Sequence, residues 1–312
     1  MQVFENPEAL PPPFRGGVVA VGNFDGVHPG HAQLIRTAID RARAESRSAG
    51  VLTFEPHPKA VFKRDAPPFR LTPWPIKRRL LAELGLDVAV VLTFDSDFAS
   101  RTAETFIDRT LVNALGVGHV VVGYDFCFGR DRAGTGETLT EAGKSKGFGV
   151  TRVEKIKGAD GEAFSSSRIR HQIAEGDVRS AARLLGRPFE IEAEVERGDR
   201  LGRELGFPTA NLRLGKTLQP AFGIYAGQAL VDGSWRDAAV SLGIRPTVAD
   251  RGVLLEVHVL DYMGDLYGKT LRIRLIDYLR PEAKFPDLDA LKRQIAEDCR
   301  LARQRLALAA AS

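Results

Sequence analysis

The hydrophobic positions in the first half of the chain fall into two kinds of segment that alternate. Short apolar runs, which are typical of buried strands, cover residues 18–22, 49–54, 87–94 and 119–123. Helical spacing of apolar residues predicts helices over residues 31–44, 76–85 and 103–116. The prolines of residues 55–75 predict a loop without regular structure. Strand–helix alternation of this kind predicts an α/β fold, a parallel sheet with helices on both faces.

Three of the expected strands end in segments that are suited to binding a ligand. GNFDGVHPGH begins at residue 22, FEPHP at residue 54 and GYDFCFGRDRAG at residue 123. Ligands of parallel α/β sheets bind beyond the carboxyl ends of the strands. We therefore expect these segments to converge on one cleft.

The pattern changes after about residue 185. A short helix is expected over 177–186, and strands are expected over 189–197, 223–231, 234–242, 253–260 and 270–277. The Asp232–Gly233 pair between two of these runs is a hairpin signal. A final helix over 287–309 would place Leu288, Leu291, Ile295 and Ala302 on one face. The chain therefore divides into an α/β domain, residues 1–186, and a small antiparallel barrel or sandwich closed by a C-terminal helix, residues 187–312.

Composition and charge narrow the class of protein. The 312 residues carry a net charge of +4, with no run of five or more Lys or Arg, so a nucleic-acid partner is not expected. No apolar stretch is long enough to cross a membrane, and the N-terminus does not resemble a signal peptide. Cys127 and Cys299 are too few for a disulfide framework or a zinc site. These features favour a cytoplasmic enzyme with small anionic substrates.

The GNFDGVHPGH segment combines a glycine-rich turn with two histidines at the expected start of a helix. His28 and His31 would lie beside unpaired backbone N–H groups, which favours a phosphate ligand. The three-residue spacing also occurs in metal sites, but Pro29 and Gly30 argue against a regular helix there, and no third ligand is evident. A glycine-rich turn with capping histidines is the alternative without a ligand.

Two further segments of the first half carry candidate chemistry. In FSSSRIR (164–170), hydroxyls and Arg170 stand at a helix start, which suits phosphate but also fits a simple capped helix. In GYDFCFGRDRAG, Phe126 and Phe128 would project to one side of an extended segment, with Cys127 opposite. Two aromatic rings suit a flat ligand ring, and ordinary core packing is the alternative.

The segment GDRLGRELGFPTAN (198–211) is the most specific run in the second half. Its glycines could let the backbone close over phosphates, and Thr209 and Asn211 offer oxygen ligands of the kind that Mg²⁺ prefers. A surface hairpin with turn glycines is the alternative. Further on, Val253, Leu255, Val257 and Val259 form an apolar face, so Glu256 points the other way, toward a cleft or simply toward solvent.

The first half resembles the nucleotidylyltransferase superfamily and, within it, the bacterial FAD synthetases. GNFDGVHPGH matches GxFDxxHxGH, FSSSRIR stands in place of ISSTxIR with Ser167 for threonine, and GYDFCFGRDRAG matches GxDFxFGxxRxG. FEPHP also matches that family. The resemblance implies a Rossmann-like domain in which His28, His31 and Arg170 stabilise charge on the triphosphate. It implies ATP or phosphate binding by Gly22, Phe24, Asp25, Gly30, Ser166, Ser167 and Arg168, and flavin binding by Asp125, Phe126 and Phe128.

The second half resembles the riboflavin kinases, a family without a Walker loop. GDRLGRELGFPTAN matches GxxxGxxLGFPTAN, and VSLGIRPTV (240–248) and LEVHVLDYMGDLYGK (255–269) match later blocks of the family. Ala193 departs from the glycine of many relatives, away from these motifs. The resemblance implies a small antiparallel β-barrel with a C-terminal helix. In it, Glu256 is the general base, Thr209 and Asn211 hold Mg²⁺, and Gly198, Gly202 and Gly206 contact ATP.

Together the resemblances imply a bifunctional enzyme of flavin cofactor synthesis. The second domain would phosphorylate riboflavin to FMN with ATP and Mg²⁺, and the first would adenylylate FMN to FAD and release pyrophosphate. The expected partners are these small molecules, with neither nucleic acid nor membrane. Two alternatives remain, a transferase whose barrel only binds flavin and a flavin sensor or carrier without turnover. Intact Thr209, Asn211 and Glu256 argue against the first, and intact His28, His31 and Arg170 against the second.

Overall fold

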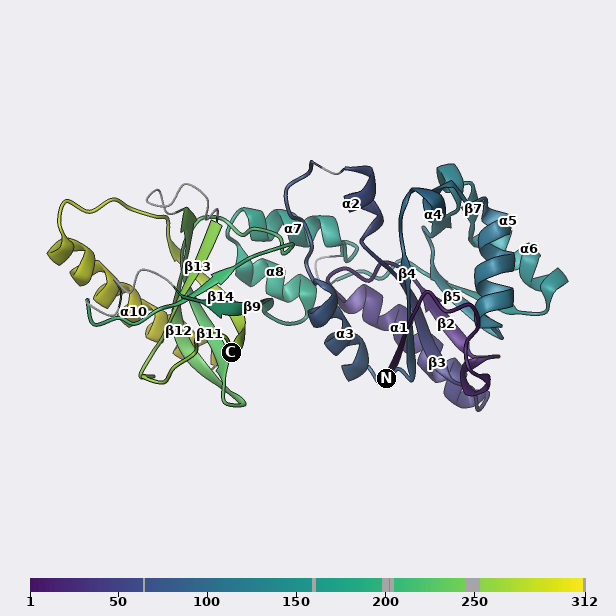
Figure 1. Cartoon of the computed structure of the whole chain (residues 1–312), viewed down its shortest axis with the longest axis horizontal. Helices are drawn as coiled ribbons and strands as arrows, with labels where there is room; N and C mark the ends of the chain where they lie inside the picture. The colour runs from purple at the N-terminus through teal and green to yellow at the C-terminus, as the bar shows by residue number, and fades with distance from the viewer. Residues whose placement is uncertain (64, 159–160, 198–201, 203–204, 245–252, 311–312) are drawn as a thin grey trace. The chain divides into compact units, whose positions relative to one another are not determined.

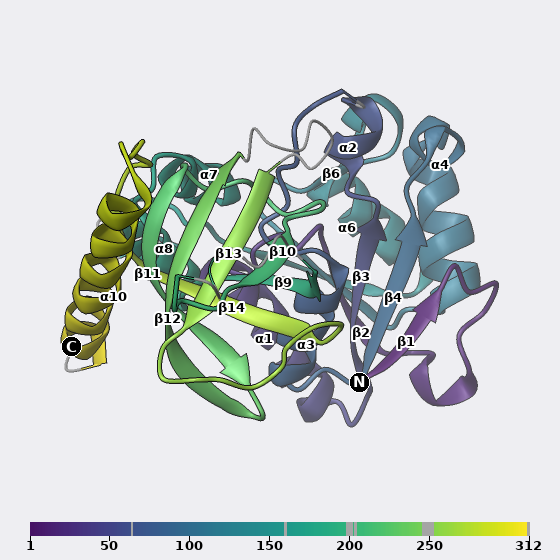
Figure 2. The same cartoon turned by 60° about the vertical axis from the view of Figure 1, so that its left-hand side comes forward.

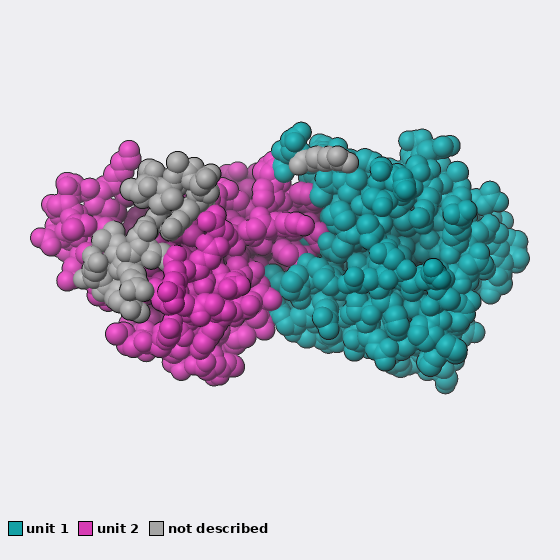
Figure 3. Space-filling model, in the orientation of Figure 1, with its two compact units in different colours: residues 1–66, 74–164 teal, residues 67–73, 165–312 magenta. Residues whose placement is uncertain are grey.

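The computed structural model of the chain describes residues 1–63, 65–158, 161–197, 202, 205–244 and 253–310. The chain folds into two compact units (Figure 3). Unit 1 is residues 1–66 and 74–164, and unit 2 is residues 67–73 and 165–312. Of the predicted site residues, Gly198 lies outside the described residues, as does the end of the VSLGIRPTV block. The predicted domain boundary after residue 186 stays a prediction.

Unit 1 is built on a six-stranded sheet in which every neighbouring pair of strands is parallel (Figure 1). The order in the sheet is β1-β4-β3-β2-β5-β8. The strands are β1 (Gln2–Glu5), β2 (Val18–Val21), β3 (Ala49–Glu55), β4 (Val88–Thr93), β5 (His119–Gly123) and β8 (Gly149–Val153). The apolar runs predicted β2 to β5 correctly, and the parallel sheet is confirmed. β1 and β8 were missed because they lie at the sheet edges and lack continuous apolar runs.

Successive residues of the central strands pack on opposite faces of this sheet. Val18 and Ala20 of β2 belong to one hydrophobic core, and Val19 and Val21 belong to another. Helices α1 (Pro29–Ala44) and α3 (Trp74–Glu83) contribute to the first core. The π-helix η2 (Phe106–Leu115) and helix α6 (Gly136–Lys146) contribute to the second. Helices therefore cover both faces, as the alternation predicted.

The prediction that residues 55–75 lack regular structure is wrong. The proline-rich residues 55–75 contain a short helix, α2 (Pro58–Phe62), and the start of α3. Pro58 occupies the first helical position, where its missing N–H costs no hydrogen bond. The helix predicted over 103–116 forms as α5 (Ala103–Thr105) followed by η2. The other short elements of unit 1 are η1 (Pro12–Phe14), α4 (Ser96–Ser100), β6 (Cys127–Phe128), η3 (Arg130–Arg132) and β7 (Gly134–Thr135).

Unit 2 contains a closed antiparallel barrel with the strand order β10-β13-β12-β11-β14-β9 (Figure 2). The barrel and the C-terminal helix are confirmed. The strands are β9 (Phe189–Glu196), β10 (Ala210–Arg213), β11 (Gly223–Val231), β12 (Ser234–Ile244), β13 (Val253–Val259) and β14 (Thr270–Arg280). Asp232 and Gly233 join β11 to β12 with φ of 49° and 80°, as the hairpin signal predicted.

Helices of the described residues pack on this barrel at two places. Ile169 and Ile173 of α7 (Ser166–Ala174) share its main core, as do residues of α8 (Val178–Leu185). Helix α10 (Leu288–Ala310) packs against β11, β12 and β14, where Ala302 joins a smaller core and Ile295 packs beside it. Leu288, the first residue of the helix, is 57% exposed, so this end of the predicted apolar face does not reach the smaller core.

Candidate functional site

The loop after β2 has an unusual backbone conformation. Phe24 and Val27 have φ of 49° and 41°, in the left-handed region that non-glycine residues rarely adopt, and Gly26 has φ of 93°. The Phe24 side chain is only 1% exposed and belongs to the core beside α1. Any contact of Phe24 with ATP would therefore come from its backbone. Asp25 is also buried, at 2% exposed.

The two histidines of this loop lie at the start of α1. His28 is the N-cap residue, and its Nδ1 accepts a hydrogen bond from the backbone N–H of His31 at 3.2 Å. The imidazoles stack with centroids 3.6 Å apart, and the Phe164 ring lies 6.3 Å from that of His28. A β-carbon at Gly30 would lie 3.2 Å from the His28 ring, so the glycine allows this close packing.

The conformation of His28 and His31 indicates whether the two rings could share a metal ion. Pro29 does not disrupt the helix, contrary to the expectation, because it occupies the first helical position. Its neighbour His28 uses Nδ1 to cap the helix, which leaves that nitrogen engaged. Within the described part of the chain, no group of three or more His, Cys, Asp and Glu residues could hold a metal ion. The helix start beside the two rings offers backbone N–H groups of the kind that bind an anion.

The sheet topology relates the three candidate segments of unit 1. GNFDGVHPGH follows β2, FEPHP overlaps the end of β3, and GYDFCFGRDRAG begins at the end of β5. The spatial order β3-β2-β5 makes these strands neighbours, and all run parallel, so the segments lie at the same edge of the sheet. The chain also reverses its direction of progress across the sheet between β2 and β5. Nucleotides bind at such switch points in open α/β sheets.

The aromatic pair of GYDFCFGRDRAG lies on one side of its segment, as predicted. The rings of Phe126 and Phe128 stack with centroids 5.5 Å apart and an interplanar angle of 18°. Phe128 is 8% exposed and its ring lies 5.2 Å from that of Phe106, so core packing accounts for this residue. Phe126 is only half-buried and Asp125 is exposed. These two side chains are better placed than Phe128 to reach a ligand.

All residues of the FSSSRIR motif except Phe164 belong to unit 2. Ser166 and Ser167 form the first turn of α7, and Ser165 caps the helix by accepting a hydrogen bond from the N–H of Ser167 at 3.2 Å. Arg168 is half-buried in the same turn. The Nε of Arg170 donates to the carbonyl of Phe69 at 2.9 Å. The cap is the one expected of an ordinary helix start, and the phosphate role of these residues stays a prediction.

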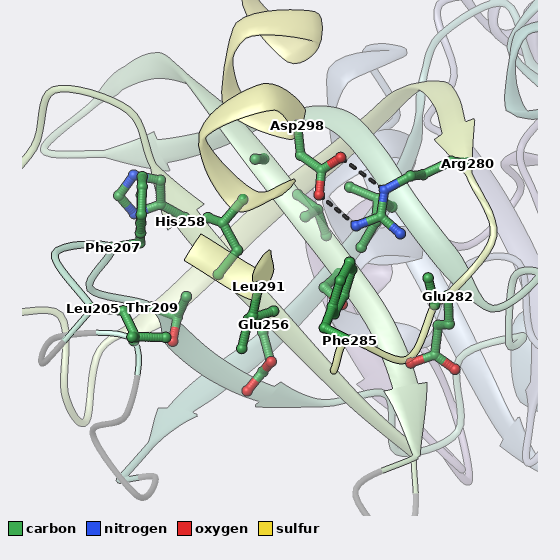
Figure 4. A pocket seen from close by; sticks show the side chains of 17 residues that line it. Leu205, Phe207, Thr209, Glu256, His258, Arg280, Glu282, Phe285, Leu291 and Asp298 are labelled. Atoms are coloured by element: carbon green, nitrogen blue, oxygen red, sulfur yellow. Dashed lines mark hydrogen bonds and ion pairs between the residues drawn. The ribbon is translucent and has the colours of Figure 1, made fainter. Parts of the chain in front are cut away.

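A second candidate site lies in unit 2, between the outer surface of the barrel and α10. A cavity of about 270 Å³ opens there (Figure 4). Its polar side chains come from the strands β12, β13 and β14, from residues just before β10 and just after β14, and from α10. The lining residues are Gly202, Leu205, Phe207, Thr209, Ile224, Ala239, Val240, Ser241, Glu256, His258, Arg280, Glu282, Ala283, Phe285, Leu291, Ile295 and Asp298.

The register of the barrel brings polar residues far apart in sequence into one row. Glu256 of β13 stands directly opposite Asn211 of β10 on one side and Ser241 of β12 on the other. Directly opposed residues point to the same face of a sheet. Leu255 and Val257 are in the barrel core, so Glu256 points outward into the cavity, as predicted.

The predicted metal ligands lie on this same side. Thr209 lines the cavity, and Asn211, which is 7% exposed, is the neighbour of Glu256 in the row. A hydroxyl, an amide and a carboxylate together form an oxygen donor set of the kind that suits Mg²⁺. Gly202 also lines the cavity, and a β-carbon there would lie 2.5 Å from the Phe207 carbonyl oxygen. Gly206 has φ of 90°, a left-handed conformation that favours glycine.

Sequence reasoning missed two features of the cavity wall. Arg280 of β14 makes a two-pronged ion pair with Asp298 of α10, at 2.8 and 2.6 Å (Figure 4). His258 is close to the carbonyl oxygen of Pro208, with Nδ1 at 2.8 Å. A carbonyl only accepts, so Nδ1 carries the proton and Nε2 is the acceptor of the neutral ring. An alternating strand pattern places His258 beside Glu256 on the outer face, but nothing in the sequence pairs Arg280 with Asp298.

Two family models match the chain, one in each half. The FAD synthetase model matches residues 11–168, and the riboflavin kinase model matches residues 185–306. The first covers the histidine loop and the aromatic segment, and the second covers the whole cavity. The order of the two models along the chain is the order that the motifs predicted.

Curated relatives align with nearly all of the chain. Bifunctional riboflavin kinase/FMN adenylyltransferases from Pseudomonas fluorescens and Escherichia coli K12 are 40% and 41% identical to it. These alignments cover 100% and 94% of this chain, and 99% and 93% of the relatives. A crystal structure titled as a macrolide-efflux protein from Streptococcus pneumoniae is similar with a TM-score of 0.86 and 31% identity, over 96% of this chain and 98% of that one. In the described residues, no helix is both long and apolar enough to span a bilayer.

Proposed function

The chain belongs to the family of bifunctional riboflavin kinase/FMN adenylyltransferases, and we propose which of its residues carry each reaction. Its C-terminal riboflavin kinase domain transfers a phosphoryl group from ATP to riboflavin and makes FMN. Its N-terminal FAD synthetase domain joins FMN to the AMP part of ATP and releases pyrophosphate. We place the division between the domains at residues 186 and 187, close to residue 185, where the match to the riboflavin kinase model begins.

The kinase reaction uses the cavity of unit 2. Glu256 is the general base that takes the proton from the 5′-hydroxyl of the ribityl chain, because its carboxylate points into this cavity from the barrel wall. The single observation that supports the proposal best is the row of Asn211, Glu256 and Ser241, which only the closed barrel brings together. Phe285 and Leu291 offer an apolar wall for the flavin ring.

Thr209 and Asn211 are the residues that would hold Mg²⁺ together with ATP phosphates. Asn211 of β10 stands opposite the proposed base, and Thr209, just before β10, lines the same cavity. When bound, the ion neutralises charge on the transferring phosphoryl group. Gly202 and Gly206 have no side chains, so the backbone at these two positions could approach the phosphates closely.

The adenylyl transfer reaction uses the edge of the unit 1 sheet. His28 and His31 would stabilise negative charge on the triphosphate at the start of α1, where helix N–H groups also point. Asp125 and Phe126 would hold the flavin nucleotide, with Phe128 supporting Phe126 from the core. A separate prediction, which rests on the motif, is that phosphate is also bound by Ser166, Ser167, Arg168 and Arg170.

One incubation distinguishes the proposed pair of activities from its alternatives. Purified chain is incubated with riboflavin, ATP and Mg²⁺, and the flavins are separated by chromatography. The proposal predicts FMN followed by FAD. FAD from added FMN but not from riboflavin would indicate an inactive barrel, and unchanged riboflavin and FMN would indicate a flavin binder. Since both reactions consume ATP, we expect the chain to act in the cytoplasm, without nucleic acid or membrane as a partner.

A further inference from the structure

A lysine in unit 1 is completely buried, and neither predicted reaction uses it. Lys77 of α3 has 0% exposure, and its Nζ lies 2.8 Å from Oε1 of Glu55. The same Nζ donates to Oγ1 of Thr53 at 3.3 Å and to the backbone carbonyl of Asn23 at 3.2 Å. It also lies 5.8 Å from the centre of the Trp74 ring. One ammonium group thus joins α3, the end of β3 and the loop after β2.

The carbonyl of Asn23 receives two hydrogen bonds from buried donors. Thr53, which is also 0% exposed, donates its hydroxyl proton to this carbonyl at 3.2 Å and accepts from Lys77. The ammonium group and the hydroxyl therefore bond to each other and also share the Asn23 carbonyl as acceptor. The orientation of the peptide between Asn23 and Phe24 is fixed from two directions.

That peptide leads directly into the strained part of the loop. Phe24, with φ of 49°, is the next residue, and Val27, with φ of 41°, precedes His28. Backbone conformations of this kind are costly and persist only where the surrounding structure enforces them. The buried Phe24 ring fixes one side of the strained segment, and the two donors to Asn23 fix its beginning.

Stability alone does not explain a charged group at this position. Burying an ammonium group carries a large desolvation cost, and buried ion pairs are often replaced by apolar residues without loss of stability. The neighbouring positions Ile76, Leu80 and Leu81 of α3 are apolar and buried, so an apolar side chain would suit the same face. The specific effect of Lys77 is on the loop that carries the two histidines.

We propose that Lys77, together with Thr53, is a positioning residue for adenylyl transfer. The two side chains hold the Asn23 carbonyl and so set the path of residues 23–27, which places His28 and His31 at the triphosphate. The inference rests on the proposed role of this loop. Lys77 is completely buried, so it acts through the loop and not on the substrate.

The test compares three variants of the full chain: Lys77→Met, Thr53→Val and the double variant. Methionine keeps an unbranched side chain but removes the ammonium donor. We expect Lys77→Met to lower kcat for FMN adenylylation by about 10- to 100-fold, the scale of a misplaced catalytic group, with KM for FMN within about twofold. Thr53→Val keeps the lysine and its bond to Asn23 but removes the hydroxyl that bonds to both groups. It should lower kcat by about fivefold, the scale set by its neutral hydrogen bond to the Asn23 carbonyl. The double variant should be slowest.

Controls on the same chain separate positioning from folding. Arg78→Met removes a charge from an exposed position of the same helix and should leave both reactions unchanged. Riboflavin phosphorylation should persist in every variant, and Trp74 emission, read in a Trp235→Phe background, should show that unit 1 is folded under assay conditions. Thr53→Val decides the matter if Lys77→Met does not fold.

Two results would overturn the inference. One is full adenylylation by folded Lys77→Met or Thr53→Val, and the other is an equal fall in kinase activity. His31→Ala is assayed in parallel. Full adenylylation activity of His31→Ala would refute the proposed role of the loop itself. Slow adenylylation by His31→Ala together with full activity of Lys77→Met would refute only the positioning role of Lys77.

Discussion

Replacing Asp298 by alanine removes the ion pair that joins α10 to the barrel at the kinase cavity. The Asp298 side chain is 4% exposed and accepts two hydrogen bonds from Arg280, at 2.8 and 2.6 Å. Gln294 donates a third at 3.0 Å. Both partners of the pair line the cavity, so we expect Asp298→Ala to affect the stability of unit 2 and the binding of riboflavin together.

The size of the effect follows from the burial of the two partners. Breaking a fully buried pair by removing one partner costs about 3–5 kcal/mol, because a charge stays behind without compensation. The Arg280 side chain is 21% exposed, and its Nη1 would still donate a hydrogen bond to the carbonyl of Pro281, at 2.9 Å. Water can therefore solvate part of the remaining charge. We expect a loss of about 3 kcal/mol in the free energy of unfolding of unit 2, the lower end of the range.

The two tryptophans of the chain allow the units to be followed separately. Trp74 lies in unit 1 and Trp235 in unit 2, where its ring stacks 3.8 Å from the Arg274 guanidinium. Urea unfolding of Asp298→Ala in a Trp74→Phe background, followed by Trp235 emission, reports on unit 2. KM for riboflavin is measured on the same preparations and should rise more than kcat falls, because the pair supports the cavity wall and takes no part in the reaction.

Glu297→Ala is the matched control, one residue away on the same helix. Glu297 pairs with Arg300, and both side chains are about half exposed, at 45% and 54%. Such exposed pairs contribute little to stability. We therefore expect the control to unfold like the parent. Equal stability of Asp298→Ala and Glu297→Ala, with the same KM for riboflavin, would show that the buried pair does not support the cavity.

His31→Ala should lower FAD formation from FMN and ATP by about 10²-fold or more, as for the loss of one charge-stabilising donor, and full FAD synthesis on chromatography would remove His31 from the catalytic residues. Asn211→Ala should raise the Mg²⁺ concentration needed for half-maximal FMN production, and an unchanged dependence in a protein with normal circular dichroism would place the ion elsewhere. Burial lowers the pKa of His119 from 6.5 to about 4, so the unfolded chain binds a proton in this interval and the folded chain does not. Unit 1 should therefore lose stability as the pH falls from about 6.5 to about 4. Unfolding followed by Trp74 emission measures this loss, and it should be smaller in His119→Gln. If the stability of His119→Gln fell with pH as steeply as that of the parent, His119 would not be its cause.

Local patterns were sufficient for most of the fold and for the direction of individual side chains. The apolar runs located β2 to β5, and strand alternation placed Glu256 on the face away from the core. These features depend on residues near one another in sequence. Leu288 shows where the same reasoning fails, because a helical face continues along α10 but the barrel surface does not reach its first residue.

The parts that could not be predicted depend on pairings between distant residues. The row of Asn211, Glu256 and Ser241 requires the register of β10, β12 and β13 in a closed barrel, which no local pattern specifies. Lys77 is a further case. In IKRRLLAELG it is the first of three consecutive basic residues and is indistinguishable in type from its exposed neighbour Arg78. Only the folded sheet places its ammonium group beside Asn23.

The central claim, that the chain performs its two reactions at separate sites, is tested most directly by Glu256→Gln. Glutamine keeps the size of the side chain and its capacity to hydrogen-bond, but it cannot act as the general base. Riboflavin phosphorylation should fall by at least about 10²-fold, the usual contribution of such a base. Because Glu256 lies in the barrel wall and outside unit 1, adenylylation of FMN supplied from outside should continue at nearly the parent rate. Loss of both reactions in a well-folded Glu256→Gln protein would contradict the two-site account.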